Sequence, residues 1–250
     1  MRVPSTDLNK SLGIFASKGI VEIPTWRATK AKFQFKSFLL AEAYARNDDV
    51  DWLEVFEKIK LGCEGKLSGQ DWLNYRDEIG VDFEIIPGCE TIGGYFDLND
   101  QLVKIQFTQD VLELIKTADK KSLKQLAKNF WINFCHEDTH RQQFLKAGED
   151  HFNYKAPSSL DWNVDMGENL EYFDQSVEAD AYGREIGARL RTIHPRKTTS
   201  QLFLSINSNL IKDPYCKHII NIYRDPRISE KANHAFFRAL YDYLEGNEIV

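Results

Sequence analysis

Two histidines four residues apart, in a stretch of helix-forming character, constrain the fold around them more than any other feature of this chain. His136 and His140 lie in the run NFWINFCHEDTHRQQF, residues 129–144. On an α-helix, side chains at positions i and i+4 lie on one face about one turn apart, so both imidazoles can bind the same metal ion. Glu137 stands beside that face, where a carboxylate can polarise a metal-bound water. The HExxH pattern therefore predicts a metal-binding helix.

The residues around this pattern are typical of a helix that lies between two layers. At 100° per residue, Ile132, His140 and Gln143 are among the side chains that project within about 40° of His136. The far side of the helix is apolar and carries Leu123, Ala127, Phe130 and Phe134. A surface helix with a chance pair of histidines is the alternative, although exposed helix faces usually carry Lys and Glu instead.

Composition and charge narrow the classes of partner. The chain has 250 residues, a net charge of −6 and no cluster of Lys and Arg, so nucleic acid and anionic membranes are not expected partners. We find no apolar segment long enough for a signal peptide or a membrane span, which predicts a cytoplasmic protein. The substrate or partner expected for a metal site of this kind is a peptide or a protein, and the sequence does not indicate an oligomeric state.

The four cysteines form no CxxC pair and are interpreted as free thiols in a reducing compartment: Cys63, Cys89, Cys135 and Cys216. Cys135 directly precedes His136 but projects about 100° away from it on a helix. We therefore interpret Cys135 as a small buried apolar residue and not as a metal ligand.

Hydrophobic periodicity predicts helices, then a small sheet, then helices. Helices are expected at 31–60 (a pair), 70–79, 109–117, 120–147, 168–192, 200–223 and 229–244. Strands are expected at 83–87, 93–97 and 102–107, the last two as a hairpin, and residues 148–167 are expected to form a long loop that could border a cleft.

This order predicts the α+β class, dominated by helices, with a small antiparallel sheet or hairpin before the helix of the two histidines. We expect residues 1–250 to form a single domain. Its parts would be a helical N-terminal part at 1–80, a core at 81–192 and a helical C-terminal part at 193–250.

A second helix offers a carboxylate ligand. In the expected helix at 168–192, one stripe carries Glu171, Asp174, Glu178, Tyr182 and Glu185. Acidic neighbours on a free surface repel each other by a few tenths of a kcal/mol per pair, whereas a bound cation would attract them all. A solvated acidic face is the alternative interpretation.

The combination resembles the gluzincin branch of the zinc metallopeptidases, in which a HExxH helix is followed by a helix with a Glu ligand. Residues 177–183, VEADAYG, are similar to the Glu-Ala-Asp/Asn-x-aromatic-small pattern of compact cytosolic or phage-type zincins. The resemblance covers about residues 83–190. It implies that Glu178 is the third Zn²⁺ ligand beside His136 and His140, and that the edge of the hairpin at 93–107 receives extended peptide.

The chain also departs from that pattern. The family places an Asp one turn after the Glu ligand to orient a histidine, but Tyr182 occupies that position here. Asp174 and Asp180 are the nearby carboxylates, and the sequence leaves open which one supports the site. Glu171 is the rival third ligand. No third histidine follows His140 at the metzincin spacing.

The leading hypothesis is a zinc metallopeptidase in which Glu137 is the general base. The residue that stabilises the transition state is left open among Tyr182, His194, Tyr172 and His151. One alternative is a catalytically silent zincin-like module for binding or regulation. Another is a di-iron carboxylate protein, because Glu137 and His140 also form an ExxH motif, but the chain has no second ExxH at the required spacing.

Overall fold

The computed structural model describes residues 39–45, 51, 55, 81–87, 92–148 and 166–246. Within these ranges the protein is dominated by helices and has a small mixed sheet, which confirms the predicted α+β class. The chain divides into two compact units, Met1–Phe134 with Val250, and Cys135–Ile249, and each is described by itself. Residues 39–45 and Val55 are helical, whereas the rest of the expected helix pair and the helix at 70–79 lie outside the described residues.

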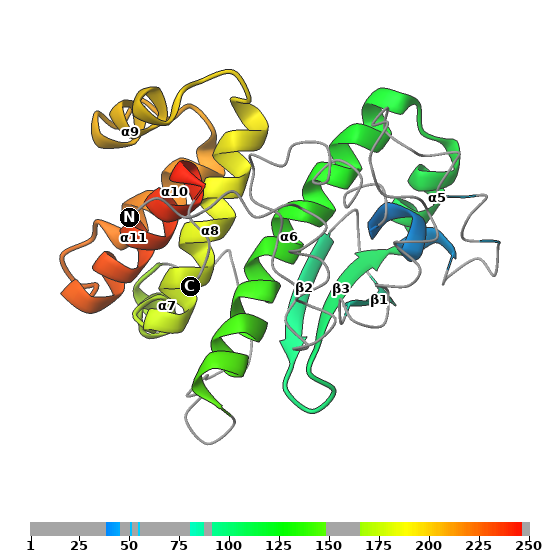
Figure 1. Cartoon of the computed structure of the whole chain (residues 1–250), viewed down its shortest axis with the longest axis horizontal. Coiled ribbons are helices and arrows are strands. Elements are labelled where there is room, and N and C mark those ends of the chain that lie inside the picture. The colour runs from blue at the N-terminus through cyan, green and yellow to red at the C-terminus, as the bar shows by residue number, and fades with distance from the viewer. Residues whose placement is uncertain are drawn as a thin grey trace, which may run out of the picture. The chain divides into compact units, whose positions relative to one another are not determined.

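Among the described residues, the sheet of the first unit has three strands in the order β1-β3-β2 (Figure 1). These are β1 (Val81–Ile86), β2 (Ile92–Asp97) and β3 (Leu102–Thr108). β2 and β3 are antiparallel, which confirms the predicted hairpin. β1 pairs with the other edge of β3 in the parallel direction, so the sheet is mixed and not purely antiparallel as expected.

Successive side chains along each strand point to opposite faces of the sheet, and here one face is apolar and the other is polar. Val103, Ile105 and Phe107 of β3 are buried on the apolar face, and the ring centroid of Phe107 lies 5.6 Å from that of Phe130. The polar face holds Lys104, whose ammonium lies 3.2–3.9 Å from the carboxylates of Asp82, Glu84, Asp97 and Asp100. These ion pairs explain why a charged lysine is tolerated in the central strand.

Two helices follow the sheet at the positions that the sequence predicts. They are α5 (Gln109–Thr117) and α6 (Lys120–Ala147), and α6 carries both histidines. Asp119 accepts a hydrogen bond from the backbone N–H of Ser122 at 2.7 Å, which satisfies one of the open donors at the start of α6. The helix ends at Gly148, which has a φ of +80°, a left-handed conformation that favours glycine.

The described part of the second unit contains the end of α6 and five more helices. These are α7 (Met166–Phe173), α8 (Ser176–Ile193), α9 (Thr199–Asn207), α10 (Pro214–Tyr223) and α11 (Glu230–Glu245). The last one confirms the predicted helix at 229–244. None of the described helices combines the length and the apolar character that a membrane crossing requires.

The single helix expected at 168–192 is wrong, because the chain breaks between α7 and α8 at Asp174 and Gln175. Asp174 Oδ1 accepts a hydrogen bond from the backbone N–H of Ser229 at 2.5 Å, at the start of α11. This contact draws the chain out of the helical path.

The single helix expected at 200–223 is wrong as well. Asn209 has a positive φ of 55°, and α10 begins with Pro214 after Asp213. The Asp213 side chain accepts a hydrogen bond from the Cys216 backbone N–H at 2.8 Å and so caps the new helix. The residue before a proline disfavours the helical conformation, which separates α9 from α10.

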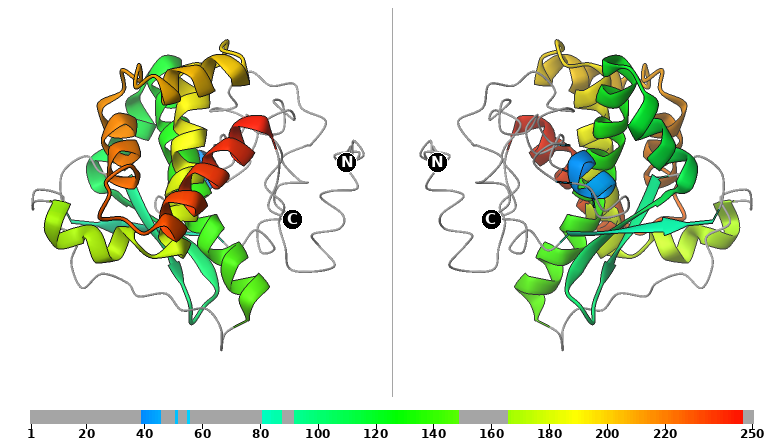
Figure 2. Two further views of the ribbon diagram at one scale, coloured as in Figure 1. Left: turned by 90° about the vertical axis from the view of Figure 1, so that its left-hand side faces the viewer. Right: turned by 90° about the vertical axis from the view of Figure 1, so that its right-hand side faces the viewer.

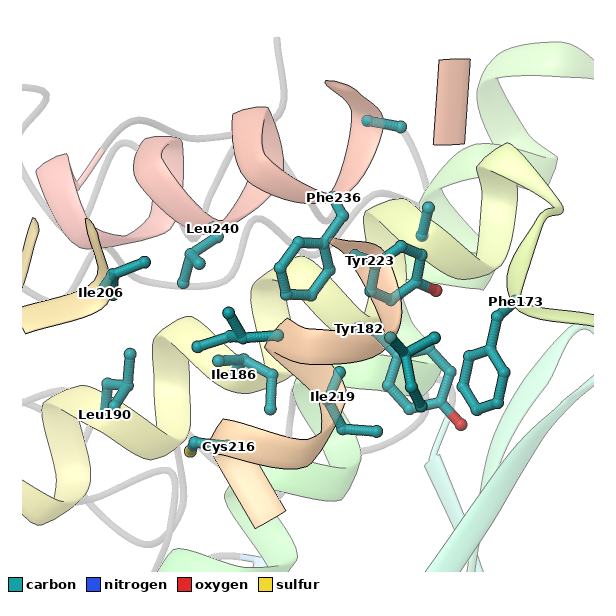
Figure 3. Close-up of a cluster of buried hydrophobic side chains, with 14 of the residues drawn as sticks. Phe173, Tyr182, Ile186, Leu190, Ile206, Cys216, Ile219, Tyr223, Phe236 and Leu240 are labelled. Carbon is teal, nitrogen blue, oxygen red and sulfur yellow. The ribbon is translucent and has the colours of Figure 1, made fainter. Parts of the chain in front are cut away.

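The core of the second unit is built on the contact between α8 and α11, which lie side by side (Figure 2). Gly183 of α8 makes this approach possible, because a Cβ at that position would lie 2.4 Å from the backbone oxygen of Phe236. Aromatic rings fill the adjoining space, and Tyr223 stacks on Phe236 with ring centroids 4.2 Å apart (Figure 3). This packing fixes the position of α8, which carries the predicted Glu ligand.

Candidate metal centre

The structure brings together His136, His140 and Glu178, the three residues that the sequence singled out. One ligand atom from each lies within 4.8 Å of the others. The two histidines come from α6 and the carboxylate from α8, and all three side chains lie in the second unit. They are buried, with exposed fractions of 8%, 3% and 0%. Such a buried cluster of two imidazoles and a carboxylate could bind a metal ion.

The contacts between the end of α6 and α8 follow an antiparallel register. His140 Nε2 lies 3.5 Å from Glu178 Oε1, and His136 Nε2 lies 3.7 Å from Glu178 Oε2. Two turns later on α8, Glu185 lies beside His136. At the other end, Gln143 contacts the first turn of α8. The single carboxylate of Glu178 therefore faces both histidines.

Glu185 fixes the orientation of His136. His136 Nδ1 lies 2.9 Å from Glu185 Oε2. A carboxylate only accepts hydrogen bonds, so Nδ1 carries the proton and donates it. Nε2 on the opposite side of the ring then faces Glu178, where a metal would bind. A carboxylate behind a metal-binding histidine sets its tautomer and raises its basicity.

Gln143 fixes the orientation of His140 in the same way. The amide nitrogen of Gln143 donates to the Val177 carbonyl oxygen at 3.1 Å and to Asp180 Oδ2 at 3.2 Å. The amide oxygen is thereby directed to His140 Nδ1 at 3.1 Å, so this nitrogen must be the donor. Both histidines consequently direct Nε2 towards Glu178.

Tyr172 of α7 holds the carboxylate itself. Its hydroxyl donates a hydrogen bond to Glu178 Oε2 at 2.6 Å. Glu178 Oε1 is buried and accepts no hydrogen bond in the part of the chain that the structure describes. A buried carboxylate oxygen in this condition is costly unless a cation is bound to it. The donor set therefore fits a divalent metal ion.

The pKa values of the three groups reflect their mutual contact. Burial lowers the pKa of His136, but the contacts with Glu178 and Glu185 outweigh it and raise this pKa well above its ordinary value. Burial is the main reason why the pKa of His140 falls to about 4. Burial raises the pKa of Glu178, but His136 and His140 more than offset it and lower this pKa below its ordinary value. In the metal-free site His136 therefore favours the cationic form, with a second proton on Nε2, whereas His140 favours the neutral form.

Metal binding should therefore depend on pH with a defined sign. Binding at His136 Nε2 displaces the proton, whereas His140 is already neutral above about pH 4. We expect the apparent affinity for Zn²⁺ to rise about tenfold per pH unit between about pH 5 and 7, below the raised pKa of His136. Competition against a chromophoric chelator, corrected for protonation of the chelator, measures this slope. An affinity that is constant over the interval would contradict the assignment.

The same pKa shift affects the stability of the metal-free protein in the opposite direction. Because the folded pKa of His136 is raised, its stabilising contribution is complete below the ordinary pKa of 6.5. That contribution is lost as the pH rises through the raised pKa. Increasing pH therefore raises the affinity for the metal and lowers the stability of the metal-free protein.

The other three residues of the HExxH segment divide between two tasks. Glu137 is buried with an exposed fraction of 8%, and its charge is close enough to His136 to raise the pKa of that histidine. Asp138 is fully buried and forms an ion pair with Arg141 at 2.5 Å. The Thr139 hydroxyl donates to the Cys135 carbonyl oxygen at 2.7 Å. Asp138 and Thr139 thus stabilise the helix, and Glu137 is a buried carboxylate that acts electrostatically on His136.

Glu171, the rival third ligand, and Cys135, the neighbour of His136, are not part of the His136, His140 and Glu178 cluster. Glu171 is exposed on α7, and Asp174 is hydrogen-bonded to Ser229. Cys135 is buried as a free thiol, as its helical position predicts. Cys63 and Cys89 lie outside the described residues.

The four candidates for stabilising the transition state are placed differently. Tyr172 contacts Glu178, and the ring of Tyr182 lies edge-on to His136 with centroids 4.7 Å apart. His194 caps the far end of α8, about 24 Å along the helix from Glu178 at 1.5 Å per residue. His151 lies outside the described residues. Among the described candidates, only Tyr172 and Tyr182 contact a residue of the His136, His140 and Glu178 cluster.

Sequence reasoning did not assign Glu185 and Gln143 their contacts with the histidines. The sequence points to Asp174 or Asp180 as the supporting carboxylate, but Glu185 is the one that contacts His136. A signal was present, because Glu185 lies two turns after Glu178 on the same stripe. In an antiparallel pair of helices, that position falls beside the earlier histidine.

No protein-family model matches the sequence, and the comparisons with curated proteins and with solved structures found no match either. The function is therefore argued from the chemistry of the site.

Proposed function

We propose that the protein is a zinc-dependent hydrolase that cleaves peptide bonds, with His136, His140 and Glu178 as ligands and Glu137 as general base. One observation carries the proposal. Each of the three ligand side chains is held by a neighbour, so that Nε2 of both histidines faces the carboxylate of Glu178, His140 at Oε1 and His136 at Oε2. Supported ligands of this kind are typical of metal sites and are not expected of a chance cluster.

Zinc is favoured by the donor set. Two imidazole nitrogens and one carboxylate oxygen are a common ligand set of catalytic zinc, which leaves a further position for water. Two histidines and one carboxylate also suit Fe²⁺. Glu137, adjacent to His136 on the same helix, favours hydrolysis because that reaction needs a base for the attacking water. The resemblance to gluzincins supports the same choice.

The metal ion and Glu137 would have separate tasks in the reaction. A bound zinc would supply Lewis acidity, both to the scissile carbonyl and to the attacking water. Glu137 would accept a proton from that water and then deliver it to the nitrogen of the leaving amine. The family resemblance further predicts that peptide adds to the edge of the hairpin, and β2 is an edge strand of the described sheet.

The proposal is tested with zinc-loaded protein and a mixture of unmodified peptides. We expect mass spectrometry to detect new termini at peptide bonds, to lose them when a chelator removes the zinc, and to detect them again after Zn²⁺ is restored. Protein that holds zinc by elemental analysis and leaves every peptide intact would contradict a peptidase.

A metal-binding module without turnover is the second candidate, and the burial of the site favours it. His140 and Glu178 are only 3% and 0% exposed, which is typical of a closed site. Such a module would bind zinc with the same ligands and leave all peptides uncut. The peptide experiment therefore separates the two candidates.

A further inference from the structure

Tyr172 gives the two carboxylate oxygens of Glu178 different hydrogen-bond environments. Its hydroxyl lies 2.6 Å from Oε2 and donates a hydrogen bond to it. Oε1 accepts no hydrogen bond from the residues that the structure describes, although it is buried. Both oxygens face a histidine, since Oε2 lies 3.7 Å from His136 Nε2 and Oε1 lies 3.5 Å from His140 Nε2, but only Oε2 accepts a hydrogen bond from Tyr172.

The Tyr172 ring is held in position by its neighbours. Its centroid lies 5.3 Å from that of Phe173 and 6.3 Å from that of Tyr182, edge-on to both. The Tyr182 ring lies in turn against His136. Edge-to-face contacts of this kind restrict the rotation of the rings. The hydroxyl is therefore preorganised towards Glu178 and needs no rearrangement when a metal binds.

We propose that Tyr172 restricts Glu178 to coordination through Oε1 alone. The inference rests on the proposed metal site and assigns Tyr172 a positioning task. A carboxylate can bind a metal through one oxygen or through both. If Oε2 also bound the ion, it would occupy the position that a catalytic zinc leaves for water. By engaging Oε2, Tyr172 keeps that position open.

Tyr172→Phe isolates this hydrogen bond. Phenylalanine keeps the ring and its packing but removes the donor. Oε2 is then left in a buried site without its hydrogen bond, so it gains by turning to the metal. We expect the variant to bind metal at least as tightly as wild type, with one more ligand atom from Glu178 and with lower peptidase activity.

The readout is the visible spectrum of protein in which Co²⁺ replaces Zn²⁺. Absorption bands of four-coordinate Co²⁺ are several-fold more intense than those of five-coordinate Co²⁺. We expect intense bands for wild type and several-fold weaker bands for Tyr172→Phe at equal cobalt content. Tyr223→Phe is the matched control. Its buried hydroxyl has no hydrogen-bond partner in the described part of the chain, so the intense spectrum should persist.

The outcomes separate this inference from the proposed function. A wild-type protein that binds neither Co²⁺ nor Zn²⁺ would overturn the metal site itself. A wild-type protein that binds metal while Tyr172→Phe shows an unchanged spectrum would overturn only the task of Tyr172. Loss of metal from Tyr172→Phe, with the fold preserved by circular dichroism, would overturn it as well, because a freed carboxylate is expected to bind more firmly.

Discussion

Replacing Glu137 with Gln is expected to reduce kcat/KM for peptide cleavage by at least about a hundredfold while the protein keeps its zinc. General acid–base groups contribute about 10²–10⁴-fold to the rate, and Gln has the shape of Glu but cannot accept the proton of water. Glu137 is not one of the three proposed ligands, so the metal content should stay at the wild-type value. Peptide turnover and elemental analysis on the same samples measure both quantities.

Glu171→Gln is the matched control for this experiment. It makes the same chemical change at an exposed carboxylate of α7, outside the His136, His140 and Glu178 group. Its activity should equal that of wild type. If Glu137→Gln retained wild-type turnover, Glu137 could not be the base, and the hydrolytic mechanism would have to be abandoned.

Gly183→Ala is expected to lower the free energy of unfolding by about 1–3 kcal/mol, the usual cost of overpacking a core. The added Cβ would lie 2.4 Å from the Phe236 backbone oxygen and 3.0 Å from the Leu240 backbone nitrogen. Backbone atoms cannot rotate away, so α8 and α11 must separate. This loss should exceed the gain of about 1 kcal/mol that Ala brings to a helix.

Gly187→Ala, one turn further along α8, provides the comparison. Its Cβ would lie 2.9 Å from Tyr243 Cδ1 and 3.0 Å from Tyr243 Cβ and Cγ, which are side-chain atoms and not backbone atoms. We expect this variant to lose less stability than Gly183→Ala and therefore to unfold at a higher urea concentration, because its shortest contact is longer and involves no backbone atom. Equal midpoints for the two variants would show that the close approach at Gly183 does not limit the packing of the two helices.

The helical period predicts the pair of histidines, whereas the prediction of Glu178 on another helix comes from the family resemblance. His136 and His140 share a helix face through the helical period alone, and the structure brings both beside Glu178. Gln143 and Glu185 act through contacts between helices. The His136–Glu185 contact spans 49 residues of sequence, and only the register of α6 against α8 determines it. The hydrophobic periodicity of a single helix does not predict how that helix is aligned against its neighbour.

The two wrong helix predictions differ in the same way. The start of α10 has a local signal, since Asp213 followed by Pro214 is a typical helix beginning. The break at Asp174 has none, because it depends on the backbone of Ser229, 55 residues further along the chain. Likewise the hairpin of β2 and β3 follows from local turn formers, whereas the parallel pairing of β1 requires the assembled sheet.

The central claim is that His136, His140 and Glu178 hold one zinc ion, and metal content tests it most directly. Wild type, Glu178→Ala and Glu171→Ala are purified without added metal and measured by elemental mass spectrometry. We predict one zinc per chain in wild type and in Glu171→Ala, and its loss from Glu178→Ala. Absence of zinc from wild type, or equal zinc in all three proteins, would contradict the claim.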